Sequence, residues 1–325
     1  MSGSINTSIP EGSIIQDIRS SIVYDVLILG AGPAGLTAAV YAMRKGLTTA
    51  MLTDNIGGQV TETATVDNYM GYRHIEGAAL IDKFFEQIQQ FPIAFLQGVN
   101  VTGLSMDNGE LGVKCDDENT YRAKTLIVAT GKSPRRLGIP GEKEFTGMGV
   151  AYCAICDAPL YRGLKTAVVG GGNSAIESAI DLCKIAREVH IIQNLPNLTA
   201  DSVLIEKLNE FDNFKIYYNS VPKEVLGDKL VKQLVVKDSD KSETFTIDVD
   251  GVFVSIGLIP NTDCVKGFLD LNENNEIVID YDCNTSVAGV FAAGDVTTVS
   301  VKQIIVAAGE GAKAALSAHK HLLEN

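Results

Sequence analysis

Cys153 and Cys156 stand two residues apart near the middle of the chain, and Asp157 follows them directly. Thiols at this spacing can close a disulfide, and one thiol can activate the other for exchange. The neighbouring carboxyl group could give or take the proton that thiolate chemistry requires, although an aspartate here also suits a turn or a helix cap. The three residues are therefore predicted to be catalytic, as a redox-active dithiol with its acid–base group.

Structural zinc is another common use of such a cysteine pair, and it requires four ligands, usually from a second Cys or His pair. The chain has six cysteines and four histidines, and no histidine is paired near a cysteine in the required way. No metal site is expected. Cys115, Cys183, Cys264 and Cys283 stand alone on apolar or strand-like segments, so they are predicted to be buried structural thiols.

The elements that must position the dithiol begin with an apolar run at 24–29, which is long enough for a fully buried parallel strand. It leads into GAGPAG at 30–35 and then into a helix-like stretch. Gly30 permits a tight bend, Gly32 lets the backbone approach a pyrophosphate, and Gly35 lets the helix pack on the strand. The diphosphate would lie on the free amides of the helix N-terminus. This pattern predicts a dinucleotide site.

The same unit recurs after the dithiol, where a strand at 166–169 leads into GGGNSA at 170–175 and a second helix-like stretch. Gly30 is matched by Gly170, and Gly35 is matched by Ala175. An internal repeat of a whole nucleotide-binding unit implies two bound dinucleotides. We expect the second to be held by Gly170, Gly172, Asn173, Ser174 and Ala175.

The end of the following strand usually specifies the nicotinamide coenzyme. An acidic residue there binds the ribose 2′-hydroxyl of NADH, whereas arginines hold the 2′-phosphate of NADPH. The segment at 193–199 reads QNLPNLT and has neither an acidic nor a basic residue. NADPH is therefore disfavoured and NADH stays compatible, with the use of neither coenzyme left open.

Three more segments carry residues that suit a cofactor. Gly57, Gly58 and Gln59, with Asn68 beyond them, form either a binding loop or an ordinary polar loop. A buried strand at 126–129 ends in Ala129, Thr130 and Gly131, and a strand at 289–293 closes in Gly294 and Asp295. The last of these could point amides and a carboxylate at a phosphate and a polyol, or be an ordinary strand end. Gly- and Pro-containing stretches at 131–141 and 258–262 suggest domain boundaries.

Composition limits the class of protein. A chain of 325 residues with 46% hydrophobic and 21% charged residues can form two globular α/β domains. Its net charge of −13 argues against binding nucleic acid. No apolar run approaches the ~18 residues of a membrane span, and the N-terminus lacks the features of a secretory signal. A cytoplasmic protein without a membrane partner is expected.

The order of these features closely resembles the low-molecular-weight thioredoxin reductase family of flavoproteins. It is especially similar to the flavoprotein component, component F, of bacterial alkyl hydroperoxide reductase. The resemblance covers about residues 23–322, and its most specific motifs are GAGPAG at 30–35, CAICD at 153–157, GGGNSAIE at 170–177 and GVFAAGDV at 289–296.

The resemblance implies an α/β fold of two Rossmann-like dinucleotide-binding domains. Residues 23–134 and 263–325 would form a discontinuous FAD-binding domain, and residues 135–262 an inserted pyridine-nucleotide-like domain that carries the dithiol. Residues 1–22 would be an N-terminal arm. The resemblance further implies a homodimer in which the central domain swings between two poses.

The resemblance also assigns roles. Cys156 would face the flavin, Cys153 would attack the partner's disulfide, and Asp157 would be the acid–base group. The residues expected to contact the FAD are Gly30, Gly32, Pro33, Ala34, Gly35, Thr53, Gly57, Gly58, Gln59, Asn68, Ala129, Thr130, Gly131, Gly294, Asp295, Lys302, Gln303 and Ile304.

The chain departs from the family pattern at the coenzyme site. The His-Arg-Arg pattern that binds NADPH in thioredoxin reductases is replaced by Gln193, Asn194 and Leu195, and the later arginine position is Thr199. The peroxide-reductase flavoprotein has an acidic residue where this chain has Gln193. That flavoprotein also carries an N-terminal thioredoxin-like domain, whereas about 20 polar residues precede the first strand here. A separate partner protein is therefore expected.

These observations predict an FAD-dependent protein disulfide reductase that acts on a thioredoxin- or glutaredoxin-like protein, with NADH favoured over NADPH as donor. A reductase fed by ferredoxin or another donor is the alternative within this class. Alternatives of another class are a flavin-binding redox sensor and a ferredoxin–NADP oxidoreductase-like protein. The latter predicts a basic NADPH pocket and no cysteine pair, and this sequence matches neither feature.

Overall fold

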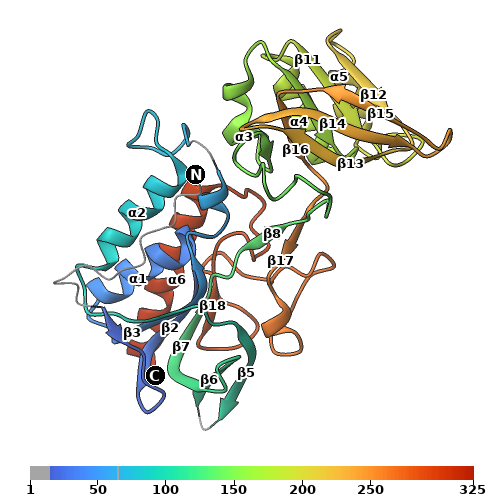
Figure 1. Ribbon diagram of the computed structural model, residues 1–325. Helices are drawn as coiled ribbons and strands as arrows, with labels where there is room; N and C mark the ends of the chain where they lie inside the picture. The colour runs from blue at the N-terminus through green and yellow to red at the C-terminus, as the bar shows by residue number, and fades with distance from the viewer. Residues whose placement is uncertain (1–14, 64–65, 108) are drawn as a thin grey trace.

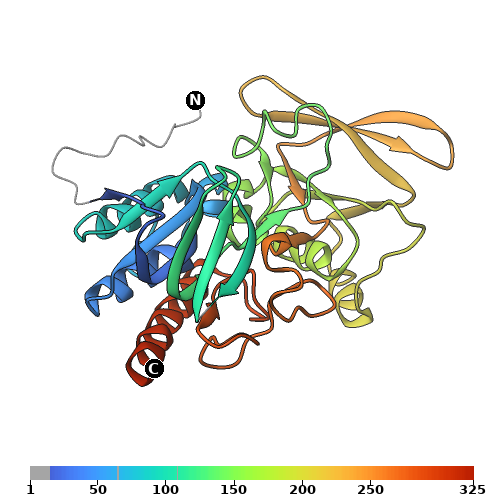
Figure 2. The same ribbon diagram turned by 90° about the horizontal axis from the view of Figure 1, so that it is seen from below.

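The computed structural model describes residues 15–63, 66–107 and 109–325, with the backbone alone at 62, 155 and 156. The described chain forms two lobes, each built on its own sheet, and two short strands cross between them (Figures 1 and 2). Helices and parallel strands alternate, so the α/β class predicted from the sequence is confirmed. Among the described helices, none combines the length and the apolar character needed to cross a membrane.

The larger sheet has eight strands in the order β1-β4-β3-β2-β7-β6-β5, with β18 also paired to β7. Its central strands are parallel, and β5, β6 and β7 form an antiparallel edge. The strands are β1 (Gln16–Asp17), β2 (Val23–Ala31), β3 (Thr49–Ile56), β4 (Ala94–Gln97), β5 (Val101–Asp107), β6 (Glu110–Cys115), β7 (Thr120–Val128) and β18 (Val290–Ala292). Because β18 pairs with β7, both ends of the chain contribute to one sheet.

The predicted N-terminal arm, residues 1–22, is described only from residue 15 onward, and its first 14 residues lie outside the described part of the chain. Within the described part, β1 pairs parallel with β4 at the edge of the larger sheet. This stretch of the arm is therefore attached to the larger lobe.

Strand β2 is buried on both faces, as its apolar sequence predicts. Val26 and Ile28 point into one apolar core, and Leu27 and Leu29 into the other. The first core is covered by α1 (Pro33–Arg44), α2 (Gly77–Ile88) and α6 (Ile304–Glu324). Helices α1 and α6 approach so closely that a Cβ on Gly311 would overlap the Ala34 carbonyl. This packing fixes the start of α1 against the C-terminal helix.

The smaller lobe holds a parallel sheet in the order β12-β11-β10-β16-β9. Its strands are β9 (Val150–Ala151), β10 (Lys165–Val169), β11 (Glu188–Ile192), β12 (Phe214–Tyr217) and β16 (Gly251–Val254). One face packs on α4 (Asn173–Cys183) and α5 (Ser202–Leu208). The other packs on an antiparallel sheet of β13 (Ser220–Gly227), β14 (Val231–Asp238) and β15 (Glu243–Asp248).

The two crossing strands are β8 (Lys132–Pro134) and β17 (Leu258–Pro260), which pair antiparallel between the lobes (Figure 1). Asn261 fixes the start of β8. Its amide donates to the Thr130 carbonyl at 2.8 Å, its side-chain oxygen accepts from the Ser133 hydroxyl at 2.9 Å, and its carbonyl accepts from the Thr130 hydroxyl at 2.8 Å. The crossing strands are thus anchored to the strand end at 129–131, where the sequence suits a cofactor.

The four lone cysteines are free thiols. Cys115, Cys183 and Cys283 are buried, as predicted, and burial raises the pKa of each to about 12. Cys264 differs because it is partly exposed and lines a cavity. Burial still raises its pKa to about 11, so its thiol is a weak nucleophile at neutral pH.

Candidate functional site

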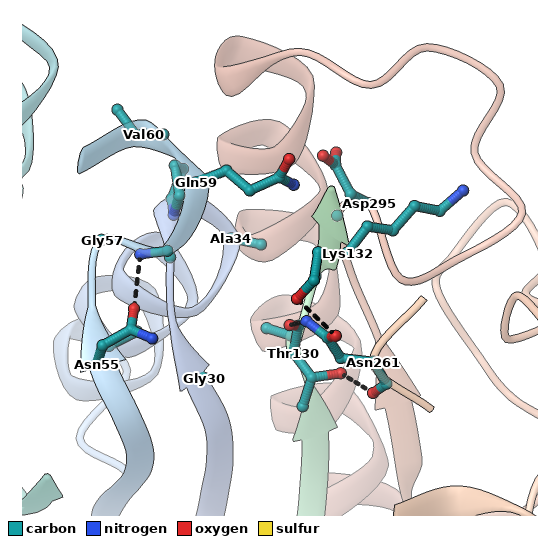
Figure 3. A pocket seen from close by; sticks show the side chains of 18 of the residues that line it. Gly30, Ala34, Asn55, Gly57, Gln59, Val60, Thr130, Lys132, Asn261 and Asp295 are labelled. Carbon is teal, nitrogen blue, oxygen red and sulfur yellow. Dashed lines mark hydrogen bonds between the residues drawn. The ribbon is translucent and has the colours of Figure 1, made fainter. Parts of the chain in front are cut away.

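A cavity of about 1000 Å³ lies against the larger lobe and reaches the segment of the smaller lobe that carries Cys153. Figure 3 shows part of its wall. Its walls come from the first glycine turn, the end of β3, the end of β7, the segment between β18 and α6, and the segment that carries Cys153. A cavity of this size is within the range of cofactor sites. The structure therefore brings the dithiol segment and the first dinucleotide turn to one space.

The glycine turn after β2 has the geometry of a phosphate cradle. Gly30 has φ = 101°, and a Cβ there would overlap the Ala129 carbonyl oxygen. Gly32 is the N-cap of α1 with extended backbone, Pro33 follows it, and no side chain caps the helix. The free amides and the positive dipole end of α1 therefore face the cavity, where they can bind an anion. Gly35 does not line the cavity: a Cβ there would overlap the Gly30 carbonyl, so it closes the turn.

Thr53 lines the cavity but uses its hydroxyl within the protein. The hydroxyl accepts from the Ala31 amide at 3.2 Å and donates to the Asn55 carbonyl at 2.5 Å. Asn55 in turn accepts from the Gly58 amide at 3.2 Å (Figure 3). Thr53 thus ties the end of β3 to the glycine turn, and Asn55 ties it to the loop that follows.

Gln303 and Asn68 form a hydrogen bond at one edge of the cavity. The Asn68 amide donates to the Gln303 side-chain oxygen at 3.2 Å. Gln303 lines the cavity, whereas Asn68 is exposed and lies outside its wall. Asn68 therefore contributes to the site through Gln303.

Asp295 faces the cavity beside Lys132 (Figure 3). Burial raises the pKa of the Asp295 carboxyl, and the positive charges of Lys302 and Lys132 act in the opposite direction. Burial also lowers the pKa of the Lys302 ammonium, against the raising effect of Glu276. Lys132 and Glu276 were not predicted from the sequence, although Lys132 directly follows the predicted residue Gly131.

The dithiol segment forms the other wall. Cys153 is disulfide-bonded and is the N-cap of the short helix α3 (Ala154–Asp157), and both Cys153 and Asp157 line the cavity. Asp157 is only 4% exposed, and its amide donates to the Cys153 carbonyl at 3.1 Å. The side chain of Cys156 lies outside the described part of the chain. Asp157 also lines a second cavity, of about 290 Å³.

Tyr152 precedes Cys153 and was not singled out from the sequence. Its hydroxyl accepts from Arg136 at 2.7 Å and donates to Glu142 at 2.9 Å, while the Arg136 guanidinium lies 4.5 Å from the ring centre. The buried Glu142 carboxylate also accepts from the amides of Leu137 and Gly138, each at 2.8 Å. These contacts fix the position of the segment that leads to Cys153.

The second glycine turn stands apart from the cavity. Gly170 has φ = 132°, and Gly172 is the N-cap of α4, so the turn repeats the geometry of the first. The Asn173 amide donates to the Asp201 carboxylate at 2.9 Å, and its oxygen accepts from the Asp201 amide at 2.8 Å. The Thr199 amide donates to the Gly171 carbonyl at 2.8 Å. The loop after β11 is therefore fastened to this turn.

The structure thus divides the predicted residues other than Cys156, whose side chain it does not describe, into two groups. Those that line the large cavity are Gly30, Gly32, Pro33, Ala34, Thr53, Gly57, Gly58, Gln59, Ala129, Thr130, Gly131, Cys153, Asp157, Gly294, Asp295, Lys302, Gln303 and Ile304. Those that do not are Gly35, Asn68, Gly170, Gly172, Asn173, Ser174 and Ala175.

Comparison with known proteins identifies relatives along nearly the whole chain. The family model described as pyridine nucleotide-disulphide oxidoreductase matches residues 24–311. The chain is 42% identical over 311 residues to the F component of alkyl hydroperoxide reductase from Pseudomonas putida, covering 95% of this chain and 60% of the relative. It is 41% identical over 302 residues to the F component from Staphylococcus aureus (strain MRSA252), covering 93% and 60%. The chain therefore spans about 60% of the length of these curated relatives.

Solved structures of similar fold are thioredoxin reductases. The enzyme from Streptococcus pyogenes superposes with a TM-score of 0.88 at 35% identity, covering 93% of this chain and 99% of that chain. The enzyme from Giardia duodenalis superposes with a TM-score of 0.85 at 33% identity, covering 92% and 99%. The predicted resemblance and the predicted fold of two Rossmann-like domains are confirmed.

Proposed function

The chain belongs to the pyridine nucleotide-disulphide oxidoreductase family, and we propose that it is an FAD-dependent protein disulfide reductase of the thioredoxin reductase type. One observation carries this proposal: the disulfide-bonded Cys153 lines the same cavity as the glycine turn at the start of α1. A dinucleotide cofactor bound on that turn would therefore share one cavity with a redox-active sulfur.

The residues present fit FAD. Gly30 cannot carry a Cβ, and the uncapped N-terminus of α1 offers amides to a diphosphate. Asp295 would bind hydroxyl groups of the sugar chain, and Gln303 would bind the polar edge of the ring. When bound, FAD supplies two-electron transfer between a donor and a disulfide.

The chain's own groups would then handle sulfur and protons. Two electrons and two protons convert the Cys153–Cys156 disulfide to two thiols. The Cys153 thiolate would attack the partner's disulfide, forming a mixed disulfide and releasing a partner thiolate. Cys156 would resolve the mixed disulfide, and Asp157 would deliver the proton to the departing sulfur. Asp157 is the buried last residue of α3, which begins directly after Cys153, and this position beside the dithiol in the chain supports the role.

We propose NADH rather than NADPH as the donor. Gln193 follows β11 with a neutral amide, and no arginine or lysine stands in residues 193–199 to hold a 2′-phosphate. A free 2′-hydroxyl carries no charge, so NADH stays compatible with this segment. A reductase fed by ferredoxin is the alternative, because residues 193–199 lack every charge that distinguishes the nicotinamide coenzymes.

The partner we propose is a separate thioredoxin- or glutaredoxin-like protein, and the setting is a cytoplasmic homodimer. Structural relatives named thioredoxin reductases support this class of partner. The relatives named as a component of alkyl hydroperoxide reductase support it as well, since a disulfide relay to another protein suits a reductase component.

Anaerobic titration of the FAD-loaded protein tests the proposal. NADH, NADPH and reduced ferredoxin are added separately while flavin bleaching is followed by absorbance. We expect bleaching by NADH at a rate well above that by NADPH. Faster bleaching by NADPH would overturn the donor assignment, and bleaching by ferredoxin alone would establish the alternative. Failure of the protein to take up FAD at all would overturn the function.

A further inference from the structure

Three charged side chains from distant parts of the chain meet beside Asp295. Lys132 opens β8, Glu276 lies in the loop before β18, and Lys302 precedes α6. The Lys132 ammonium donates to Glu276 Oε1 at 2.6 Å, and the Lys302 ammonium lies 3.3 Å from the same oxygen. The side chains of Lys132, Glu276 and Lys302 are 11%, 14% and 19% exposed. They form one largely buried cluster.

Further hydrogen bonds hold the cluster in place. The Asn272 amide donates to Glu276 Oε2 at 2.8 Å, and the Lys302 ammonium donates to the Thr297 carbonyl at 2.6 Å. Two ammonium groups share one carboxylate, so Lys132, Lys302 and Glu276 together carry one net positive charge, and the two lysines lie in the cavity wall with the Asp295 carboxyl. That charge is fixed in position, because each group has a partner on the protein.

Stability alone is a weak reason for such a cluster. Removing charges from water is costly, and buried ion pairs can often be replaced by apolar side chains without loss of stability. The cluster is instead placed where its field acts on the cavity. Lys132 and Lys302 both line the wall with Asp295, and both lower the pKa of that carboxyl against the effect of burial.

We propose that Lys132, Lys302 and Glu276 set the reduction potential of the flavin held in this cavity. The inference rests on the proposed function. Two electrons and one proton convert neutral FAD to its anionic reduced form, which adds one negative charge to the ring system. Positive charge in a poorly solvated wall stabilises that form more than the oxidised ring. The lysines raise the potential and Glu276 moderates it, so the three are positioning residues that act through their field.

The experiment measures the two-electron potential of bound FAD at pH 7, by anaerobic reduction with a reference dye. For Lys132→Met and Lys302→Met we expect the equilibrium constant for reduction to fall about tenfold, which lowers the potential by about 30 mV. Glu276→Gln leaves both lysines without a counter-charge, so we expect a shift of similar size in the opposite direction. If the three residues had only a structural role, the Met variants and Glu276→Gln would not shift the potential in opposite directions.

Lys124→Met is the matched control. Lys124 forms an ion pair of 2.7 Å with Asp25 in the same lobe, and it does not line the cavity. Lys132→Arg and Lys302→Arg keep the charge, so their potentials should shift less than those of the Met variants, which are judged against the range of the Lys124→Met control. Potentials of the Met variants within that range would overturn the inference, as would a downward shift in Glu276→Gln.

Variants that bind FAD poorly remain informative. If the Met variants lose the cofactor, the test rests on the potential of FAD bound to Glu276→Gln. A raised potential supports the inference, and an unchanged or lowered potential counts against it. FAD content is measured first from the visible absorbance of each reconstituted protein. An unmodified protein that takes up no FAD contradicts the proposed function, whereas normal uptake with unshifted potentials contradicts this inference alone.

Discussion

Gln193 lies directly over Gly171, so close that a Cβ on Gly171 would overlap the Gln193 amide. Gln193 is 3% exposed, and its side chain is engaged by its own loop: it donates to the Asn197 carbonyl at 2.9 Å and accepts from the Asn194 amide at 3.1 Å. The next two side chains, Asn194 and Leu195, are exposed. Any charge that selects a coenzyme at this strand end would therefore have to come from the exposed positions.

Introducing cations there should create NADPH use. In Asn194→Arg/Leu195→Arg, guanidinium groups can bind a 2′-phosphate, and hydrogen bonds to charged groups contribute about 1.5–3 kcal/mol. We expect kcat/KM for NADPH to rise at least about tenfold, which corresponds to roughly 1.4 kcal/mol. Steady-state kinetics with both coenzymes measures this. Asn209→Arg, an exposed position on the same lobe, controls for added charge. NADPH kinetics that match this control would refute the coenzyme assignment.

Gly30→Ala should remove FAD binding. The residue has φ = 101°, and the new Cβ would overlap the Ala129 carbonyl. Strain in such a conformation costs on the order of 1–3 kcal/mol, and the overlap displaces the turn that receives the diphosphate. Gly46→Ala is a close control, because Gly46 has φ = 78° and open space around its Cβ position. Calorimetry and visible absorbance should show a modest loss of Tm in both variants and loss of FAD only in Gly30→Ala.

Cys153→Ser and Cys156→Ser should uncouple the flavin from the partner. Without one sulfur, the disulfide cannot form, so electrons stop at the flavin. Flavin bleaching by the donor should persist, while reduction of a thioredoxin-like substrate should fall by at least about 100-fold. Cys264→Ser removes a free thiol from the same cavity and should leave both rates unchanged. Full partner reduction by either Cys153→Ser or Cys156→Ser would exclude the proposed electron path.

The Glu276 carboxyl should make stability depend on pH. Burial raises its pKa, but hydrogen bonds from Lys132 and Asn272 and the charge of Lys302 outweigh burial, so the pKa lies below its ordinary value of 4.5. A depressed pKa stabilises the folded state above the unfolded value, and this stabilisation is lost as pH falls through the folded one. Glu276→Gln should lower the free energy of unfolding by about 1–3 kcal/mol at pH 7. The difference should shrink as pH falls below the ordinary value of 4.5 and through the lower folded pKa.

Denaturant unfolding between pH 3 and pH 7 measures this dependence. Glu86→Gln is the control, because Glu86 pairs with Lys83 at 3.0 Å but is 60% exposed. A surface pair of this kind contributes about 0–1 kcal/mol, so its variant should track the unmodified protein. If the difference in free energy of unfolding between Glu276→Gln and the unmodified protein persists unchanged to pH 3, the carboxylate charge is not the stabilising feature.

The local chemistry of this protein is determined by short stretches of its sequence. Gly30 and Gly170 adopt positive φ, and the strands before and after them form as the apolar runs predict. These features were predictable because the conformation of a turn depends on neighbouring residues and on the absence of a Cβ. Both can be read from the six residues of each glycine turn. The cysteine pair was recognisable for the same reason, since its chemistry follows from its spacing.

Long-range contacts were not predictable in this way. Lys132 and Glu276 are 144 residues apart and meet only because β8 leaves the larger lobe where the loop before β18 passes. Gln193 marks a coenzyme site in the sequence, but packing turns its amide inward. Cys264 lines the cavity, although its neighbours in the sequence are typical of a buried core segment. Burial and the facing partner come from packing of segments far apart in the chain, so residue spacing does not encode them.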